Sequence, residues 1–372
     1  MSTRQPHEGR ARRRGRRSGA SRWVGPAATL LVCAIATACG SSSTTNTSNA
    51  TSAAGSVATS TATSNAAATA TSNAAALSQV TLRVGDQAGT GAQALLSAAG
   101  LLAKLPFKIT WSDFTSGPPI LQAINAGALD IGGVGDAPPV FAAAGGAKIA
   151  IVGAFATNPD NAGLVLPKDS PITSIGQLRG KKIAVAQGSS ADYHLLTVLS
   201  KAGLSVHDVS LVYVQPAEGL AALSAGSVAA WDIWAPFIQQ VQAQRGATVL
   251  VNGDGYGSNY SYVVASRAAL DDSAKAAAIS DYLKLLDQAH IWANTHPQAW
   301  AVQWAKATGL PLGVMVAAAK DDTATPVPIN GQIVAAEQSL VDAFSTAGLI
   351  PKKYNFASYS YSGFNSVIGS GA

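Results

Sequence analysis

One stretch, GPPILQAINAGALDIGGVGDAPPVFAAAGG from Gly117 to Gly146, constrains the fold of this chain more than any other. Each of its two proline pairs lacks backbone N–H groups and suits the first turn of a helix, where those donors would be unpaired. Between the two predicted helices, Leu129–Gly133 predicts a strand and GDAPP predicts a tight turn. The order is therefore strand, loop and helix N-terminus. Open α/β sheets bind ligands at this junction, because the free N–H groups of the helix point into the crevice.

The same junction occurs twice more. The strand Gln79–Val84 leads through a glycine-rich loop, 85–91, into a predicted helix over 92–105. The strand Lys181–Ala186 leads through QGSSA into a helix that continues to Leu199. Serine at a helix start also has a plain structural use as an N-cap, worth about 1 kcal/mol. For QGSS alone we favour capping, but three such junctions in one chain favour a shared anion site in an α/β fold.

Aromatic and imidazole side chains give weaker signals. Trp231 and Trp234 lie near the end of a predicted strand, 228–234, where they could belong to the core, which is the commoner use, or shield a ligand at a cleft rim. The sequence predicts no metal site and no cofactor, and it predicts that His194 packs on its own helix. The reason is that the histidines of the body are scattered without metal-ligand spacing: His194, His207, His290 and His296.

The net charge of +5 comes from the N-terminus. Residues 1–39 hold eight arginines and one glutamate, so 17 basic and 19 acidic residues follow Cys39. The remaining chain is therefore slightly acidic, and nothing in it supports nucleic-acid binding.

The basic N-terminus has the pattern of an export signal. An arginine-rich segment precedes the apolar run 26–39, which is too short to span a bilayer. Its end, ATACG, resembles a bacterial lipoprotein box, so we expect 1–39 to be a signal peptide and Cys39 to be lipidated. A plain secretory signal cut nearby is the alternative, and the export route, general or twin-arginine, stays open. The body would then lie outside the cytoplasm, anchored by lipid to the membrane of a bacterium.

A low-complexity segment follows the lipoprotein box. Residues 40–78 consist almost entirely of Ser, Thr, Asn and Ala, with no charged residue, so we expect a disordered tether. Both cysteines of the chain, Cys33 and Cys39, precede this segment. The body therefore has neither a disulfide nor a thiol nucleophile.

Five segments together resemble a known family. GPPILQAINAGALDIGGVGDAPPVFAAAGG, LPKDSPI, GKKIAVAQGSSADYHLL, AWDIWAPF and LIPKK, in this order over roughly residues 80 to 355, resemble the aliphatic sulfonate, taurine and nitrate group of ABC-transporter substrate-binding proteins. The resemblance implies a two-lobed periplasmic-binding-protein fold of type II, with the ligand between lobes that close by a hinge motion. It implies crossovers near residues 166 and 264, so that lobe 1 comprises 79–165 plus 264–372 and lobe 2 comprises 166–263.

The resemblance also implies the positions that line the cleft. They are Gln87, Thr90, Asp136, Ala137, Gln187, Gly188, Ser189, Ser190, Trp234, Asn259 and Tyr260. None of the loops that supply them contains lysine or arginine, which favours binding of an anion by dipoles rather than by ion pairs. We expect Trp234 and Tyr260 to form an apolar wall for the organic part of the ligand.

Two positions depart from the family pattern. The usual Trp-Asp-Pro-Phe run is Trp234-Ala235-Pro236-Phe237 here, and the carboxylate occurs earlier, as Asp232. Asp86 stands where the family often has an aromatic residue. Both changes fall at expected ligand contacts, so the exact substrate stays open.

The resemblance implies a monomeric lipoprotein that captures an aliphatic sulfonate and delivers it to the membrane permease of an ABC importer. The same fold could instead bind nitrate, a thiamine pyrimidine precursor or another small organic molecule. An enzyme is the third alternative, since some desulfinases share this architecture. Those enzymes use a nucleophilic cysteine, which this body lacks, so we expect a binding protein.

Overall fold

The computed structural model describes residues 76–87 and 91–369. The predicted signal peptide 1–39, Cys39 and Thr90 lie outside the described residues, as does most of the predicted tether. The end of the tether prediction is wrong: residues 76–78 are helical, and Leu77 packs against the core of the body. The ordered body therefore begins by Ala76, because Leu77 is apolar enough to be buried.

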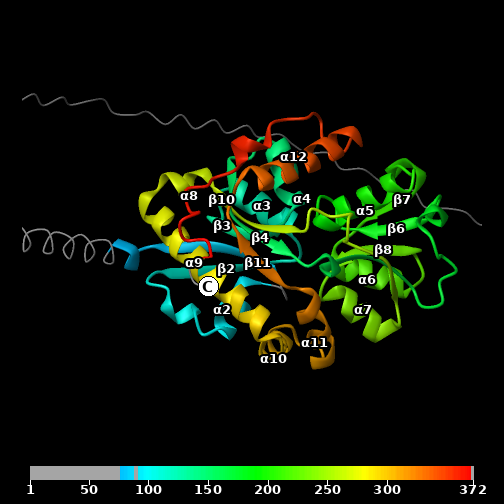
Figure 1. The fold of residues 1–372 in the computed structure, drawn as a ribbon, viewed down its shortest axis with the longest axis horizontal. Helices are drawn as coiled ribbons and strands as arrows, with labels where there is room; N and C mark the ends of the chain where they lie inside the picture. The colour runs from blue at the N-terminus through cyan, green and yellow to red at the C-terminus, as the bar shows by residue number, and fades with distance from the viewer. Residues whose placement is uncertain (1–75, 88–90, 370–372) are drawn as a thin grey trace, which may run out of the picture. The chain divides into compact units, whose positions relative to one another are not determined.

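The first lobe is built on a six-stranded sheet in the order β11-β4-β10-β3-β1-β2 (Figure 1). Strand β1 lies between β2 and β3 and is parallel to both, whereas β10 is antiparallel to β3 and β4, and β11 is antiparallel to β4. The strands are β1 (Thr81–Gln87), β2 (Lys108–Phe114), β3 (Ile131–Gly135), β4 (Ile149–Thr157), β10 (Tyr260–Ser266) and β11 (Ala324–Val327). The sequence did not suggest β11. It contains Pro326, which an edge strand tolerates because its N–H is not needed on the open side.

The second lobe is built on a five-stranded sheet in the order β7-β6-β8-β5-β9. Strand β6 is parallel to β7 and β8, and β5 is antiparallel to β8 and β9. The strands are β5 (Ala162–Leu166), β6 (Lys182–Val185), β7 (Ser210–Tyr213), β8 (Ala230–Trp234) and β9 (Thr248–Asn252).

The chain crosses between the lobes earlier than we expected. Strand β5 belongs to the second sheet, and the whole of β10 belongs to the first. The crossing segments are therefore 158–161 and 253–259, instead of positions near 166 and 264. The turn LPKDSP, which suggested the first crossing, follows β5 within the second lobe. The two crossings are bonded to each other, since the Gly253 N–H donates to the Pro159 carbonyl over 2.9 Å.

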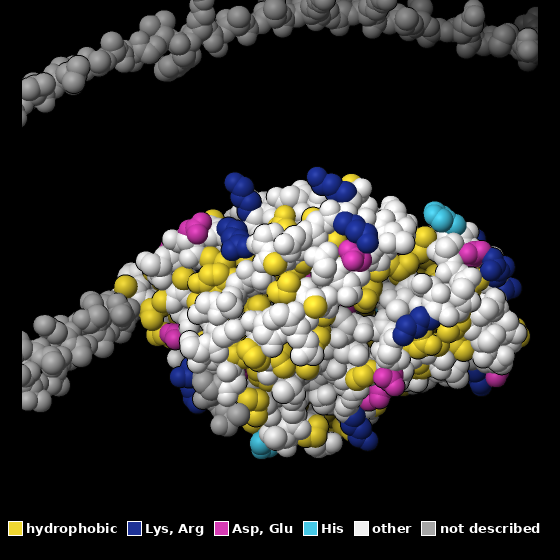
Figure 2. Space-filling view, turned by 45° about the horizontal axis from the view of Figure 1, so that its top comes forward, with side chains coloured by type: hydrophobic (Ala, Val, Ile, Leu, Met, Phe, Trp, Pro, Cys, Tyr) yellow, Lys and Arg dark blue, Asp and Glu magenta, His cyan; other side chains and the backbone are white. Residues whose placement is uncertain are grey.

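Charged side chains are sparse on the surface. On the face drawn in Figure 2 most side chains are uncharged, and some Lys or Arg side chains lie next to an acidic one. Among residues 76–87 and 91–369, no helix is both long and apolar enough to cross a bilayer.

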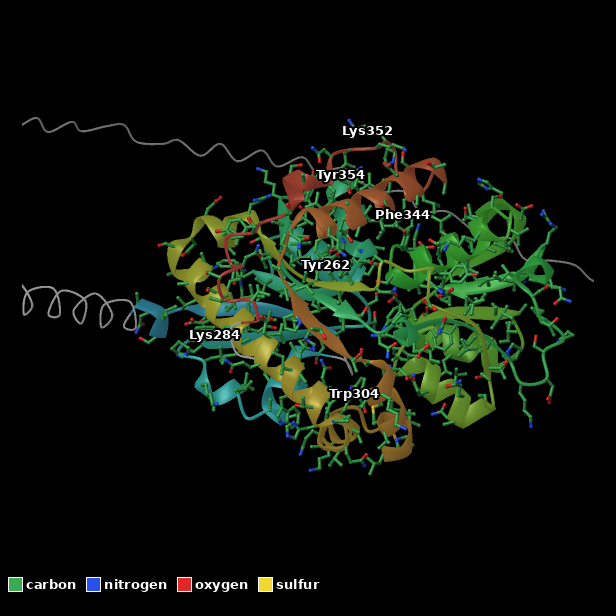
Figure 3. The ribbon with its side chains drawn as sticks, in the orientation of Figure 1. Tyr262, Lys284, Trp304, Phe344, Lys352 and Tyr354 are labelled. Atoms are coloured by element: carbon green, nitrogen blue, oxygen red, sulfur yellow. The ribbon has the colours of Figure 1, made fainter. Side chains whose placement is uncertain are left out.

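Helices cover both faces of each sheet (Figure 1), as the uninterrupted apolar strands require. In the first lobe, Trp304 belongs to one core and Phe344 to the other (Figure 3). The helices that pack into the core of Trp304 are α2 (Ala92–Ala98), α9 (Ser273–Thr295), α10 (Pro297–Thr308) and α11 (Leu312–Asp321). The helices that pack into the core of Phe344 are α3 (Gly117–Asn125), α4 (Ala137–Ala144) and α12 (Gly331–Thr346). In the second lobe, α5 (Ser190–Lys201) covers one face, and α6 (Pro216–Ser224) and α7 (Phe237–Arg245) cover the other.

The shorter elements connect these layers. The expected helix over 92–105 ends early, because Gly100 adopts φ 68° and a short 3₁₀ helix, η1 (Leu102–Lys104), follows it. The remaining short elements are α8 (Arg267–Asp271), η2 (Pro159–Asn161), η3 (Ile175–Leu178), η4 (Val206–Asp208) and η5 (Phe356–Tyr359).

Candidate ligand-binding site

A pocket of about 220 Å³ lies between the two lobes. The first lobe contributes the ends of β1, β3 and β4, the second contributes the start of α5 and the end of β8, and both crossing segments reach it. Seven of the predicted contact residues line it: Gln87, Asp136, Ser189, Ser190, Trp234, Asn259 and Tyr260. The three strand-to-helix junctions singled out in the sequence therefore do meet at one place.

The N-terminus of α5 presents unpaired donors to this pocket. The N–H groups of Ser190 and Ala191 have no hydrogen-bond partner among the described residues. The Ser190 hydroxyl oxygen accepts the Asp136 N–H across the lobe junction over 3.1 Å, and Ser190 also hydrogen-bonds to the Asp136 carboxylate and so lowers its pKa. Free N–H groups at a helix N-terminus form a ready-made anion site.

Ser189 lines the pocket but does not offer its hydroxyl. Its O–H donates to the Ala186 carbonyl over 2.7 Å, and the side chain is 3% exposed. It also makes no capping bond to α5, although it is the N-cap residue. The Ser189 hydroxyl is therefore used in this local bond, and it neither faces a ligand, as we expected, nor caps the helix, which was the alternative.

The side chain of Asp136 is hydrogen-bonded to groups of the protein. One of its carboxylate oxygens accepts the Ala137 N–H over 2.8 Å, and the other accepts the Ser258 hydroxyl over 2.5 Å. Burial raises the pKa of Asp136 above its ordinary value, and these hydrogen bonds oppose the shift. Its carboxylate thus ties the turn GDAPP to the second crossing segment, and both its N–H and its carboxylate face Ser190.

Three predicted contacts lie elsewhere, and a fourth cannot be placed. Ala137 is completely buried and its N–H is taken by Asp136. Gln187 is exposed outside the pocket. Gly188 adopts φ 70° beside Phe141, and its N–H donates to the Asp192 carboxylate over 2.9 Å. Thr90 lies outside the described residues.

The remaining predicted residues form the walls. Gln87 donates its side-chain amide to the Gly133 carbonyl over 3.2 Å. Asn259 has φ 57°, a left-handed conformation that asparagine tolerates, and its side-chain N–H₂ has no partner among the described residues. Trp234 packs edge-on against Phe237, and Tyr260 stacks on Tyr262. No lysine or arginine is among the described lining residues.

Asp86, one of the two departures from the family pattern, caps α2. Its carboxylate accepts the N–H groups of Ala92 (2.8 Å) and Gln93 (3.1 Å), so these two donors are not available to a ligand. Burial raises the pKa of Asp86 to about 6, against the effect of those hydrogen bonds.

We expect Asp86→Asn to change how stability depends on pH. A carboxyl group whose pKa is raised by folding binds its proton more tightly in the folded state, so ionisation destabilises the fold. The free energy of unfolding of the wild type, minus that of the variant, should therefore fall by about 2 kcal/mol as the pH rises from about 4 to about 6, out of about 3 kcal/mol in total. Urea unfolding across this range measures it, with exposed Asp254→Asn correcting for the loss of one charge. A difference that stays constant with pH would contradict this reading.

Asp232, the second departure, is not a ligand contact. It is 0% exposed, and its two oxygens lie 2.8 and 3.0 Å from Nδ1 of His194. Nε2 of His194 lies 2.9 Å from the Asn252 carbonyl, which can only accept, so Nε2 carries a proton. Burial lowers the pKa of His194, but the Asp232 charge and hydrogen bond outweigh it and raise the pKa above its ordinary value. An imidazolium–carboxylate pair therefore lies beside the pocket, and His194 reaches across its lobe instead of packing only on its helix.

Some lining residues were not predicted from the sequence. Asn158 and Asn161, in the first crossing, line the pocket, and Asn161 donates its side-chain amide to Asp322 over 2.6 Å. The polar run NPDN at the end of a buried strand was the signal that could have found them. His290 and Tyr282 of α9 also line it, and nothing in their spacing pointed there. Among the described residues, no group of three or more His, Cys, Asp or Glu side chains could hold a metal ion.

Comparison with known proteins gives a family and a fold. The family model described as "NMT1/THI5 like" matches residues 116–300. A protein of Escherichia coli (strain K12) named "Putative aliphatic sulfonates-binding protein" is 33% identical over 279 residues, which are 74% of this chain and 87% of that protein. The structure of the alkanesulfonate-binding protein SsuA from Xanthomonas axonopodis pv. citri bound to MOPS is 33% identical, with a TM-score of 0.72 over 76% of this chain and 98% of that one. A desulfurization enzyme shares the fold alone, at 17% identity, with a TM-score of 0.57 over 77% of this chain and 98% of the enzyme.

Proposed function

Since the chain belongs to the NMT1/THI5-like family, with aliphatic sulfonate-binding proteins among its relatives, we propose that it captures an aliphatic sulfonate between its lobes and delivers it to the permease of an ABC importer. The observation that carries this proposal is the N-terminus of α5, where Ser190 lines the pocket and the N–H groups of Ser190 and of Ala191 beside it have no partner among the described residues. A sulfonate is a permanent anion with three acceptor oxygens. Such a group suits a cluster of fixed donors in a pocket without lysine or arginine.

The proposal assigns binding rather than catalysis. The relatives that support the family are named as binding proteins. The distant desulfurization enzyme carries no argument about activity, and residues 40–372 contain no cysteine. Sulfite released from an aryl sulfinate by the purified protein would overturn this part.

The proposal places the body outside the cytoplasm as a monomer, held at the membrane by a lipid on Cys39. Its support is the sequence: the basic leader, the apolar run and the box ATACG. Mass spectrometry of the membrane-bound protein should find a diacylglyceryl group on Cys39. An unmodified mature N-terminus would instead support a plain secretory signal.

A thermal-shift panel tests the ligand class. A ligand that binds only the folded state stabilises it by about 2.7 kcal/mol at a hundredfold excess over Kd, which should raise the melting temperature by about 5 °C or more. We expect this shift with alkanesulfonates. A shift with nitrate or a pyrimidine, and none with any sulfonate, would mean that the site binds another ligand class. The family assignment would be unaffected.

A further inference from the structure

Hydrogen bonds between protein groups join the two lobes beside the pocket. The side-chain oxygen of Gln215, at the start of α6 in the second lobe, accepts the hydroxyls of Thr115 (2.8 Å) and Ser116 (2.9 Å) from the first lobe. The side-chain amide of Gln239, on α7, donates to the Asp321 carboxylate on α11 over 2.7 Å. We call these two contacts the lobe bridges. Because both partners belong to the protein, the lobe bridges can form without a ligand.

Both lobe bridges border the pocket. Gly117 follows Ser116 in the chain and lines the pocket, and Asp322 follows Asp321 and lines it as well. Ser116 is the N-cap residue of α3, yet its hydroxyl makes no capping bond and reaches Gln215 in the other lobe instead. Passage of a ligand between the first lobe and the helices α6 and α7 therefore requires the lobe bridges to open.

The contact between the lobes at α5 is of a different kind. Leu196 on this helix is 8% exposed and belongs to a core of the first lobe. Tyr193 packs its ring against Phe344 of α12, with 5.6 Å between the ring centroids. Buried apolar contacts are costly to expose, whereas a hydrogen bond near the surface can be exchanged for one to water at little net cost. The lobes should therefore part at α6 and α7, with α5 as the pivot.

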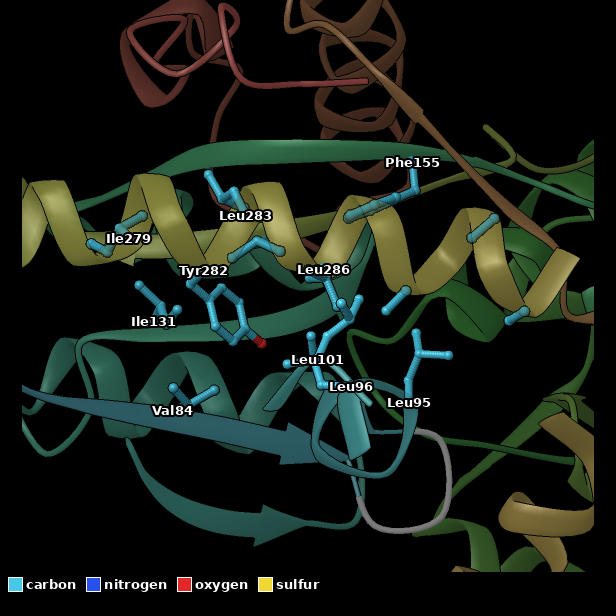
Figure 4. Close-up of a cluster of buried hydrophobic side chains, with 14 of the residues drawn as sticks. Val84, Leu95, Leu96, Leu101, Ile131, Phe155, Ile279, Tyr282, Leu283 and Leu286 are labelled. Carbon is cyan, nitrogen blue, oxygen red and sulfur yellow. The ribbon is translucent and has the colours of Figure 1, made fainter. Parts of the chain in front are cut away.

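The lobes themselves are too well packed to supply the motion. In the first lobe, Tyr282, Leu283 and Leu286 of α9 pack into one apolar core with side chains of α2 and the sheet (Figure 4). Close-packed cores of this kind move as rigid bodies. The second crossing segment, 253–259, contains three glycines, and Gly255 has φ 73°. Because glycine tolerates a wide range of backbone conformations, this segment can absorb the movement.

We propose that the lobe bridges hold the lobes closed before a ligand binds, with α5 as the pivot, so that opening limits both entry and release of the ligand. The closed state of the unliganded protein does not depend on the proposed function, and only the rates of entry and release rest on it. One hydrogen bond near the surface shifts an equilibrium by about two- to tenfold. The double variant Gln215→Ala with Gln239→Ala should therefore raise the ratio of open to closed protein by about tenfold or more.

Distances between spin labels test the closed state without any ligand. The labels are placed on Asp113→Cys in the first lobe and Gln242→Cys in the second, both exposed positions, in the full chain with its two natural cysteines replaced by serine. We expect one short distance in the protein with intact bridges and an added longer distance in the double variant. Thermal unfolding confirms that each variant is folded. The same distances in both folded proteins would overturn the inference, whatever the ligand is.

Stopped-flow fluorescence with 1-propanesulfonate tests the consequence for binding, with Trp234 at the pocket wall as the reporter. Because opening precedes both entry and release, the association and dissociation rate constants of the double variant should each rise by about tenfold, and Kd should change by less than about threefold. Faster dissociation with unchanged association would mean that the bridges form only around the ligand, and would overturn the inference. A protein that binds no sulfonate would overturn the proposed function and leave the spin-label distances to decide on the bridges.

Two further variants separate the bridges from a general effect of substitution. Gln215→Glu keeps an oxygen acceptor for both hydroxyls, so it should retain the distances and rate constants of the wild type. Gln244→Ala makes the same chemical change as the bridge variants at an exposed position of α7, and it should also behave as the wild type. If Gln244→Ala raises both rate constants as the double variant does, the lobe bridges are not what holds the lobes closed.

Discussion

Replacing Asp232 with alanine is expected to lower the free energy of unfolding by about 3–5 kcal/mol, because it leaves the buried His194 charge without its partner. His194 is 1% exposed, so water cannot replace the carboxylate. Urea or guanidinium unfolding of the variant measures the loss. Asp113→Ala is the matched control, since Asp113 is exposed on β2 and its removal should change stability by no more than about 0.5 kcal/mol.

A double variant and a pH series sharpen this test. His194→Leu with Asp232→Leu removes both charges, so it should cost less than the two single changes together. Because folding raises the pKa of His194, the stability that the pair contributes is fully present below about pH 6.5 and declines as the pH rises through the folded-state pKa. The defect of Asp232→Ala should therefore be larger at pH 6 than at pH 9. An Asp232→Ala variant as stable as Asp113→Ala would show that the pair contributes nothing.

Gly135→Ala is expected to weaken sulfonate binding by about 10- to 100-fold. A Cβ at Gly135 would lie 1.9 Å from the Ser190 hydroxyl oxygen, so that side chain must rotate away. The rotation breaks the bond from the Asp136 N–H and withdraws one hydroxyl donor from the anion. A hydrogen bond to a charged group is worth about 1.5–3 kcal/mol, which corresponds to this loss of affinity. Calorimetric titration with 1-propanesulfonate measures the effect.

The controls for Gly135→Ala separate crowding from a general effect on the strand. Gly133→Ala adds a Cβ on the same strand that meets no protein atom within 4 Å and leaves Ser190 in place, and because Gly133 also lines the pocket it measures the effect of added bulk alone. In Gly135→Ala with Ser190→Ala the overlap with the hydroxyl oxygen is removed and the nearest atom, the Cβ of residue 190, lies 3.2 Å away, so the double variant should bind about as well as Ser190→Ala alone. If Gly133→Ala and Gly135→Ala behave alike, the contact between Gly135 and Ser190 does not matter for binding.

The architecture could be predicted largely from local sequence patterns. Likeness to the SsuA structure confirms the two-lobed α/β fold of periplasmic-binding-protein type. Proline pairs, apolar runs and glycine-rich turns are local signals, so the junctions GDAPP and QGSS could be placed at strand ends from the sequence alone. The positions where the chain crosses between the lobes were harder to predict, because the turn LPKDSP within the second lobe has the same composition as a linker between lobes.

The use of individual side chains could not be predicted in the same way. Asp232 and His194 are 38 residues apart, and only the packing of α5 on the second sheet brings them together. The Ser189 hydroxyl donates to the Ala186 carbonyl and the Gly188 N–H donates to the Asp192 carboxylate at the start of α5, and the sequence does not distinguish these local bonds from ligand contacts. The place of Tyr282 and His290 at the pocket depends on the position of α9, about 200 residues after β1 along the chain.

A crystal structure of the protein with 1-hexanesulfonate tests the central claim most directly. We predict the sulfonate between the lobes, with its oxygens within hydrogen-bond distance of the N–H groups of Ser190 and Ala191 and of the Ser190 hydroxyl. A sulfonate bound elsewhere, or an empty pocket at saturating ligand, would contradict the account.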